Sequence, residues 1–198
     1  MNLHITTNHS GKMRGMASLS TPCLVNPRCK KNSQINGSVC SHCYARRFLS
    51  FRPNMNDPLE RNFQILNRKV YDVEEFPKLN VAFFRIEAFG DVASVTQARN
   101  YLRLIKQNPY VRFGWWTKNP DLIKKAIEIE EKPDNVNIML SSIYLNKPTN
   151  TRYSFIDSVF TVYEKGKCDH INCGAQLCLP CLQCYLPNPP RQINEILH

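Results

Sequence analysis

Nine cysteines of the 198-residue chain fall into two groups whose spacing suits metal binding. More than 120 residues without cysteine separate the two groups. Thiolate sulfur binds zinc and iron–sulfur clusters, and clustered thiols in a cytosolic protein more often hold metal than form disulfides. An odd number of cysteines also fits disulfide pairing poorly. The first group is Cys23, Cys29, Cys40 and Cys43, and the second is Cys168, Cys173, Cys178, Cys181 and Cys184.

The second group has the more specific spacing. Cys178, Cys181 and Cys184 follow one another at three-residue steps, and Cys173 lies just upstream. Zinc sites more often use two CxxC pairs that are a dozen or more residues apart. A consecutive CxxCxxC run instead wraps closely around a cuboidal cluster. The spacing therefore favours a [4Fe-4S] cluster over zinc, which stays as the alternative, and leaves Cys168 as the expected spare thiol.

The spacing of the first group decides less clearly between an iron–sulfur cluster and zinc. Its cysteines lie in a segment with several Pro, Asn and Gly residues, which we expect to be a loop flexible enough to fold around a metal. Four thiolates would saturate a cluster or a zinc ion, whereas three would leave one iron open to a substrate or cofactor. A redox dithiol at Cys40 and Cys43 is a weaker alternative, because two more cysteines stand close by.

Strand-like and helix-like segments alternate between the two cysteine groups, which predicts an α/β protein with a mainly parallel sheet. The sheet is either open or a partial (β/α) barrel. In both architectures the carboxyl ends of the strands share one edge, where we expect the cysteine-rich loops to converge. The predicted strands are 16–21, 80–88, 111–116, 136–142 and 158–164, and the predicted helices are 57–69, 94–107 and 121–131. The prediction is one metal-cluster domain over 1–186 and a Pro-rich tail over 187–198.

Several short motifs together resemble a family of phage-encoded, radical-SAM-like proteins, the gene-product-88-like group. The motifs are TPCLVNPRCKKN, GSVCSHCYA, FRIEAFGDV, FGWWTKNP and CGAQLCLPCLQCY, and the resemblance spans about residues 10–185. It implies a small relative of the radical SAM partial barrel with iron–sulfur clusters at the strand ends. It implies no particular substrate or reaction.

The resemblance also implies the ligands of the clusters and a site for S-adenosyl-L-methionine (SAM). In radical SAM enzymes the loop after the second strand approaches the methionyl amine of SAM, and Glu87, Gly90 and Asp91 fall in that loop. Tyr44 is expected to pack over the cluster loop, where it would limit water. The implied metal ligands are Cys29, Cys40 and Cys43, with Cys23 as a fourth, and Cys173, Cys178, Cys181 and Cys184.

Lys118 and the pair of Arg85 and Glu87 have two interpretations each, and the two tryptophans have one. Lys118 follows a strand and either contacts a carboxylate or phosphate of a ligand or is an ordinary solvated lysine. Arg85 and Glu87 alternate onto the same side of their strand, so they form a buried ion pair or face a ligand. Trp115 and Trp116 should point to opposite faces of their strand, with one of them in the core.

The formal net charge of +10 raises the question of nucleic-acid binding. The charged residues form short groups without a long basic tract, which favours a solvated basic surface over a nucleic-acid groove. No stretch is apolar for the ~18 residues of a membrane span, and the N-terminus lacks a signal-peptide core. We therefore expect a cytoplasmic protein, in the bacterial host if it is encoded by a phage, and no membrane partner.

Three functions are consistent with the sequence. The first is a radical-SAM-like enzyme with an unknown substrate and an electron donor as its partner. The second is a cluster protein without SAM chemistry that serves in electron transfer, redox sensing or protein interaction. The third is a zinc-stabilised nucleic-acid-binding protein. Phosphate-binding glycine loops, Ser-His-Asp sets and HExxH motifs do not occur, so kinase, hydrolase and zinc-protease functions have no support.

Overall fold

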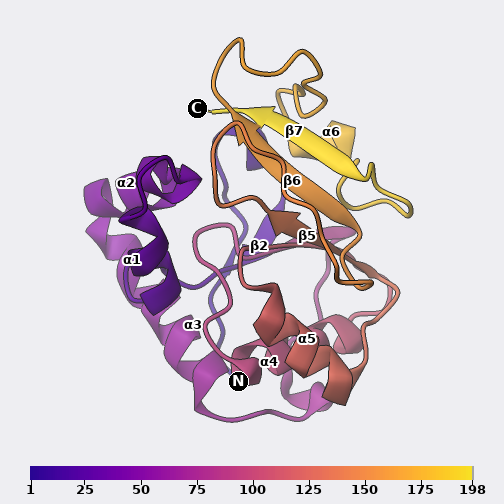
Figure 1. Ribbon diagram of the computed structural model, residues 1–198. Coiled ribbons are helices and arrows are strands. Elements are labelled where there is room, and N and C mark those ends of the chain that lie inside the picture. Colours follow the sequence, from indigo (N-terminus) through magenta and orange to yellow (C-terminus); the bar gives the residue numbers. More distant parts are fainter. Residues whose placement is uncertain (198) are drawn as a thin grey trace.

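The sheet of the computed structural model, which describes residues 1–197, has seven strands in the order in which they occur along the chain (Figure 1). β1 pairs with β2 antiparallel, and all other neighbouring pairs are parallel. The prediction of an α/β protein with a mainly parallel sheet is therefore confirmed. The strands are β1 Ile5–Thr6, β2 Ala17–Leu19, β3 Phe83–Ile86, β4 Arg112–Thr117, β5 Val136–Ser141, β6 Ser158–Tyr163 and β7 Gln192–Ile196.

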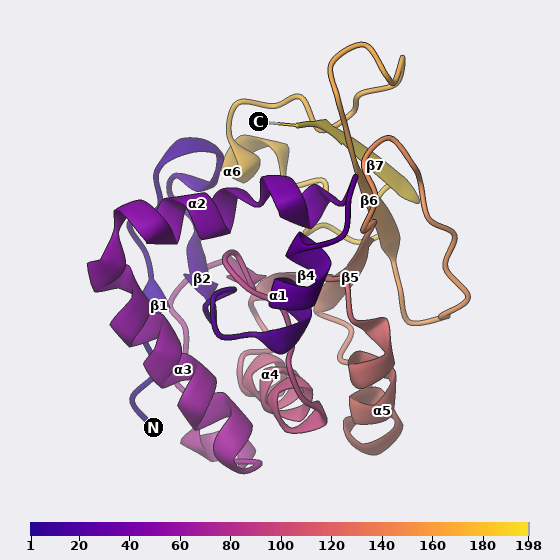
Figure 2. The same ribbon diagram turned by 60° about the vertical axis from the view of Figure 1, so that its left-hand side comes forward.

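The three longest helices pack on one face of this sheet (Figures 1 and 2). α4 has a buried side at helical spacing, which includes Ala98, Tyr101, Leu102 and Ile105, and these residues join the main hydrophobic core. Ser94 begins α4 by accepting a hydrogen bond from the N–H of residue 97. The helices are α1 Pro27–Ser33, α2 Tyr44–Phe51, α3 Asn56–Arg68, α4 Val95–Gln107, α5 Pro120–Glu130 and α6 Cys178–Cys181, with 3-10 turns η1 Gly11–Met13, η2 Val39–His42, η3 Pro53–Met55 and η4 Val73–Glu75.

The opposite face of the sheet is covered by the connection between β6 and β7. The side chain of Asn137 on β5 donates hydrogen bonds to the carbonyls of Cys184 and Leu186. Gly114 on β4 makes this approach possible, because a Cβ there would come within 2.8 Å of the Tyr185 ring. We call the face of the sheet that this connection covers the inner face.

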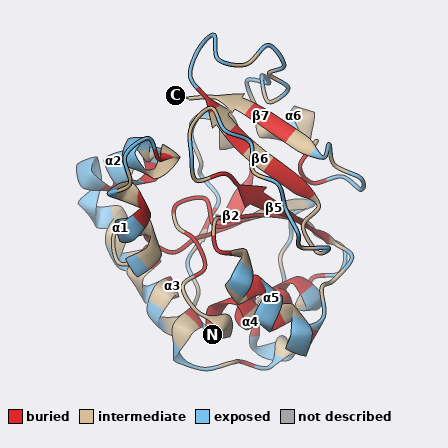
Figure 3. Cartoon of the chain, viewed as in Figure 1, coloured by how far each residue is buried: buried red, intermediate tan, exposed pale blue. Residues whose placement is uncertain are grey.

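The helices α1 and α2 lie beyond the carboxyl edge of the sheet and are held there by the residues that follow the strands. Asn26 Nδ2 donates to the carbonyl of Asp91, and the N–H of Val39 donates to the carbonyl of Ile143. Figure 3 shows α2 as mostly exposed and α1 as a mixture of exposed and intermediate residues, whereas much of the sheet is buried. Within residues 1–197, no helix is long and apolar enough to cross a membrane.

The structure corrects the sequence-based prediction at both ends of the chain. The range 187–198, expected to be a tail, contains β7, which pairs with β6 over five residues, because the prolines end at Pro190 and leave Gln192–Ile196 free to form a ladder. The segment expected to be a flexible loop contains α1, which Asn26 caps and Pro27 opens. β1 and α2 were also not predicted.

Candidate metal centre

Eight of the nine cysteines line one cavity of about 630 Å³. The cavity lies between the α1–α2 segment and the inner face of the sheet, and Cys168 is not part of its lining. The lining cysteines are Cys23, Cys29, Cys40, Cys43, Cys173, Cys178, Cys181 and Cys184. The structure thus brings together two groups that are more than 120 residues apart in the sequence.

Helix starts and turns position the first group. Cys29 lies in the first turn of α1, where its N–H donates to the side chain of Asn26. Cys40 lies in η2, and its N–H donates to Ser38 Oγ at 3.0 Å. Cys43 occupies the N-cap position of α2. Three of the four thiols are therefore fixed by local backbone structure.

The thiols of the first group differ in their readiness to ionise. The Cys23 thiol donates a hydrogen bond to Cys43, which lowers the pKa of Cys43 and raises the pKa of Cys23. Burial raises the pKa of Cys29 and Cys40, and the ammonium of Lys118 acts in the opposite direction. Because metal binding requires thiolates, Lys118 favours the metal-ligating form of these side chains.

The second group is positioned differently, in the connection that crosses the inner face. Cys178 and Cys181 form the short helix α6, which ends at Leu182 in a left-handed conformation with φ of 52°. The chain then turns back through Cys184 against β5. Burial raises the pKa of Cys184 to about 12.

Cys173 is held at the other end of the second group by a lysine. Lys12 Nζ lies 3.2 Å from Cys173 Sγ and 2.5 Å from Glu195 Oε1 on β7. The N–H of Cys173 donates to the carbonyl of Asn194, which also lies on β7. A positive charge therefore lies beside each cysteine group, Lys118 at the first and Lys12 at the second.

Glu87 and Asp91 of the loop after β3 direct their carboxylates at protein donors. Glu87 accepts hydrogen bonds from the hydroxyls of Thr21 and Tyr101, each at 2.6 Å, and from Gln97 Nε2 at 2.8 Å. Burial raises the pKa of Glu87 to about 7, although these donors favour the ionised form. Asp91 accepts from the N–H of Lys118 at 2.8 Å. Both carboxylates hold the loop in place.

The backbone of this loop remains available to a ligand. Gly90 lies so close to Thr21 that a Cβ would clash with the Thr21 carbonyl and come within 2.9 Å of Glu87 Oε2. The carbonyls of Phe89 and Gly90 accept no hydrogen bond from any residue that the structure describes. Phe89 and Gly90 both line the cavity.

Arg85 and Glu87 were expected on the same side of their strand, either as a buried ion pair or facing a ligand, but they point in different directions and form no ion pair. The backbone at Glu87 has a φ of 58°, which turns its side chain toward α4 and away from Arg85. Arg85 instead lies over the ring of Trp116, 3.5 Å from its centroid. Trp115 packs against Tyr101 on the helix side of the sheet, so the two tryptophans point to opposite faces as predicted.

Tyr44 and Lys118 both lie at the first cysteine group. Tyr44 directly follows Cys43, and its hydroxyl donates to the carbonyl of Ala88 in the loop after β3. Its ring is tilted against Phe89 at a centroid distance of 6.5 Å, while about half of the residue is exposed. Lys118 Nζ donates to Ser141 Oγ at 3.0 Å. Both side chains line the cavity.

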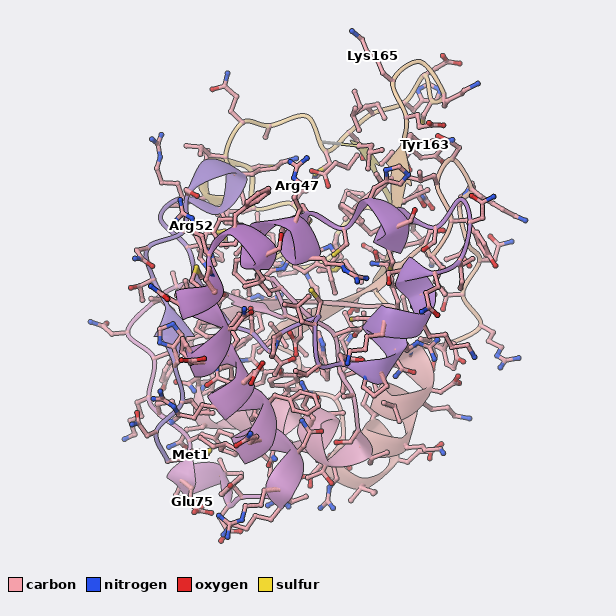
Figure 4. The ribbon with its side chains drawn as sticks, turned by 90° about the vertical axis from the view of Figure 1, so that its left-hand side faces the viewer. Met1, Arg47, Arg52, Glu75, Tyr163 and Lys165 are labelled. Atoms are coloured by element: carbon pink, nitrogen blue, oxygen red, sulfur yellow. The ribbon has the colours of Figure 1, made fainter. Side chains whose placement is uncertain are left out.

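The structure reveals a charge asymmetry that the sequence-based interpretation of scattered charges missed. Residues 1–56 contain eight Lys and Arg and no Asp or Glu, so they carry most of the net charge of +10. Arg47 and Arg52 lie along α2 and at its end (Figure 4). The exposed basic residues of this face, which we call the cationic face, are Lys30, Lys31, Arg46, Arg47 and Arg52. The position of the first acidic residue, Asp57, was the signal in the sequence.

Among residues 1–197, no group of three or more His, Cys, Asp and Glu side chains is arranged to hold a metal ion. The thiols still form a suitable donor set, because they share a cavity and have cations beside them. Fold and site together define an α/β protein with a mostly parallel sheet and a cysteine-lined cavity.

The chain matches the family model described as gene product 88 over residues 4–188. It therefore belongs to the gene product 88 family, which is a phage-type protein family. No curated protein and no solved structure matches the chain.

Proposed function

We propose that the protein is a radical-SAM-like, iron–sulfur protein with a [4Fe-4S] cluster in each cysteine group. The observation that carries this proposal is the convergence of eight cysteines, from two distant segments, on one cavity of about 630 Å³. Cysteine is the usual ligand of iron–sulfur clusters; four thiolates saturate a cluster, and three leave one iron open to a substrate or cofactor. Lys118 and Lys12 would offset part of the negative charge of the thiolates.

The strand order supports a partial barrel over an open, doubly wound sheet. Doubly wound sheets reverse their strand order at a switch point, so that helices cover both faces. Here the order from β1 to β7 is sequential, and α3, α4 and α5 lie on one face (Figure 2). Sequential parallel strands with all helices outside are the arrangement of (β/α) barrels. The inner face then corresponds to the interior of the barrel.

Within this proposal the first group is the site of SAM chemistry. A reduced cluster would supply the electron that cleaves SAM and starts radical chemistry. Cys29, Cys40 and Cys43 would be the ligands, and Cys23 would hydrogen-bond to Cys43. The free carbonyls of Phe89 and Gly90 would accept hydrogen bonds from the methionyl amine.

The loop that carries these carbonyls is held by residues that do not themselves need to touch SAM. Glu87 and Asp91 fix the loop through Thr21, Tyr101 and the N–H of Lys118. Tyr44 closes over it through its bond to Ala88. We assign Glu87 and Asp91 as positioning residues and the loop backbone as the contact with the cofactor.

Anaerobic purification with iron, sulfide and zinc quantified, followed by EPR spectroscopy of the reduced protein, tests the proposal. We expect about eight iron and eight sulfide per chain, from two cubane clusters. Addition of SAM should change the spectrum of one cluster. Clusters whose EPR spectrum does not change when SAM is added would favour the second function, a cluster protein used in electron transfer, redox sensing or interaction. Zinc without sulfide would overturn the proposal.

The cationic face supports a second candidate, a zinc-stabilised nucleic-acid-binding protein. Five exposed basic residues lie on α1, α2 and the end of α2, in a segment without a single acid. Binding to phosphates releases counterions, so the affinity for DNA or RNA would fall steeply as salt is added. Zinc content together with such binding would favour this function, whereas weak binding in low salt would exclude it.

A further inference from the structure

Three buried hydrogen-bond donors on the inner face have no acceptor among the described residues. They are Nε of Arg85 on β3, Nε1 of Trp116 on β4 and Oη of Tyr185 in the connection between β6 and β7. A buried donor that is left unpaired destabilises the folded state, and native proteins rarely leave one so. Three such donors in one place indicate a bound group that carries acceptors.

The three side chains form one contiguous set. The Arg85 guanidinium lies 3.5 Å from the centroid of the Trp116 ring, and the Trp116 and Tyr185 rings are 5.9 Å apart. All three line the cavity that the cysteines line. The donors therefore surround part of the same space and can serve a single ligand.

Glu87 and Glu195, two carboxylates that line the same cavity, already have other partners. Glu87 is turned toward α4, where Thr21, Gln97 and Tyr101 donate to it. Glu195 forms an ion pair with Lys12. The three donor atoms have no hydrogen-bond partner among the described residues, although Arg85 and Tyr185 lie within reach of each other, so a bound group can supply the acceptor.

The second cysteine group identifies this bound group. Tyr185 directly follows Cys184 in the sequence. Trp116, Tyr185 and Cys184 belong to one buried cluster, against which Cys173 and Cys178 pack, and Arg85 lies over the Trp116 ring. The acceptors closest to the donors would be sulfur atoms of whatever these cysteines hold. A [4Fe-4S] cluster adds four inorganic sulfides to the four thiolates, whereas zinc adds none.

We propose that Arg85, Trp116 and Tyr185 donate hydrogen bonds to sulfur atoms of an iron–sulfur cluster held by the second cysteine group. This inference rests on the proposed function. Hydrogen bonds to sulfur and a nearby positive charge stabilise the more negative, reduced cluster and raise its reduction potential. The three residues are thus positioning residues that make the second cluster easier to reduce than it would be without them.

An EPR-monitored redox titration of matched variants tests the inference. Tyr185→Phe and Trp116→Phe each remove one donor and keep an aromatic ring, and both should lower the potential of the second cluster while the first stays unchanged. Trp115→Phe is the control, because Trp115 Nε1 is equally unpaired but lies on the helix side of the sheet. We expect no shift of either potential in the control.

A second measurement starts from the protein without substitutions, so its main result does not depend on whether a variant folds. Trp115 and Trp116 are the two tryptophans of the chain, so protein labelled with indole-¹⁵N contains one nitrogen on each face of the sheet. Pulsed EPR of the reduced protein should show one indole nitrogen coupled to the second cluster, and Trp116→Phe should remove it. Clusters with normal iron and sulfide content but without this coupling and without shifted potentials would overturn the inference alone. A protein without iron and sulfide would overturn the proposed function as well.

Discussion

The two cysteine groups present the same ligand atoms in two different surroundings. The first lies at the carboxyl edge of the sheet, in helix starts and turns beneath the exposed helices α1 and α2. The second lies on the inner face, in a connection packed against β4 and β5 and surrounded by buried donors. The more exposed surroundings of the first group would let a small molecule or a partner protein reach it. The buried surroundings of the second group would suit a cluster that is held permanently.

Removal of thiols from one group at a time should have the largest effect. Cys40→Ser with Cys43→Ser should abolish the cluster of the first group, and Cys178→Ser with Cys181→Ser that of the second, because serine is a poor ligand for iron. Each double variant should retain about half of the iron and sulfide. The SAM-dependent change in the EPR spectrum should vanish in the first variant and persist in the second.

Cys168→Ser provides the matched control for these variants. Cys168 lies outside the cavity lining, so its replacement should leave the iron and sulfide content unchanged. Loss of all iron from either double variant would show that the two groups share one centre. Such a result would contradict the separation into two sites.

The first region contains buried carboxylates. One of them, Glu87, should make the free energy of unfolding depend on pH. Its pKa is raised by burial from 4.5 to about 7, so its contribution is fully present below pH 4.5 and is lost as the pH rises through 7. In the metal-free protein this loss amounts to about 3 kcal/mol. Urea unfolding across this range should show the loss in the native chain and not in Glu87→Gln. Parallel profiles of the two proteins would contradict the assignment.

Substitutions at two glycines, one in each region, test how tightly the two regions are packed. Gly90→Ala would push a Cβ against the Thr21 backbone, and Gly114→Ala would push one against the rings of Trp116 and Tyr185. We expect Gly90→Ala to cost about 1–3 kcal/mol of unfolding free energy, and Gly114→Ala less, because rings can shift. Gly174→Ala is the control, because a Cβ there meets nothing within 4 Å. Thermal unfolding should rank the three variants in this order, and equal losses would refute it.

The cap of α1 should have the smallest effect, confined to the first group. The side chain of Asn26 accepts hydrogen bonds from the N–H groups of Arg28 and Cys29 and donates to Asp91. Asn26→Ala should cost about 1 kcal/mol and reduce cluster content in the first group. Ser94→Ala removes the cap of α4, away from the cysteines, and should cost a similar amount without changing iron content. A loss of iron in both variants would point to general instability.

Periodic patterns in the sequence predicted most of the sheet and its covering helices. Alternation and helical spacing were sufficient for β3 to β6 and for α3 to α5, because these elements bury one side in the core. β7 was missed, because five residues directly after a proline-rich stretch give a weak pattern. The Asn26-Pro27 signal for α1 was present in the sequence, but the surrounding loop-forming residues outweighed it.

The sequence predicted the thiols of the site but not the residues that surround them. The spacing of the cysteines and the rule that parallel strands share a carboxyl edge placed the first group. The second group lies across the inner face instead, since its connection returns to β7. Arg85 and Trp116 lie on strands that pair only in the folded sheet, and Tyr185 comes from a connection that Arg112 of β4 holds by a hydrogen bond to the Tyr185 carbonyl. The expectation that Arg85 and Glu87 share one side of the strand was wrong, because the left-handed backbone at Glu87 redirects its side chain.

Anomalous diffraction from crystals of the anaerobically prepared protein tests the central claim most directly. The account predicts two iron-containing peaks in the one cavity, the first beside Cys29, Cys40 and Cys43 and the second beside Cys178, Cys181 and Cys184. Zinc at either position, or no metal at both, would contradict it.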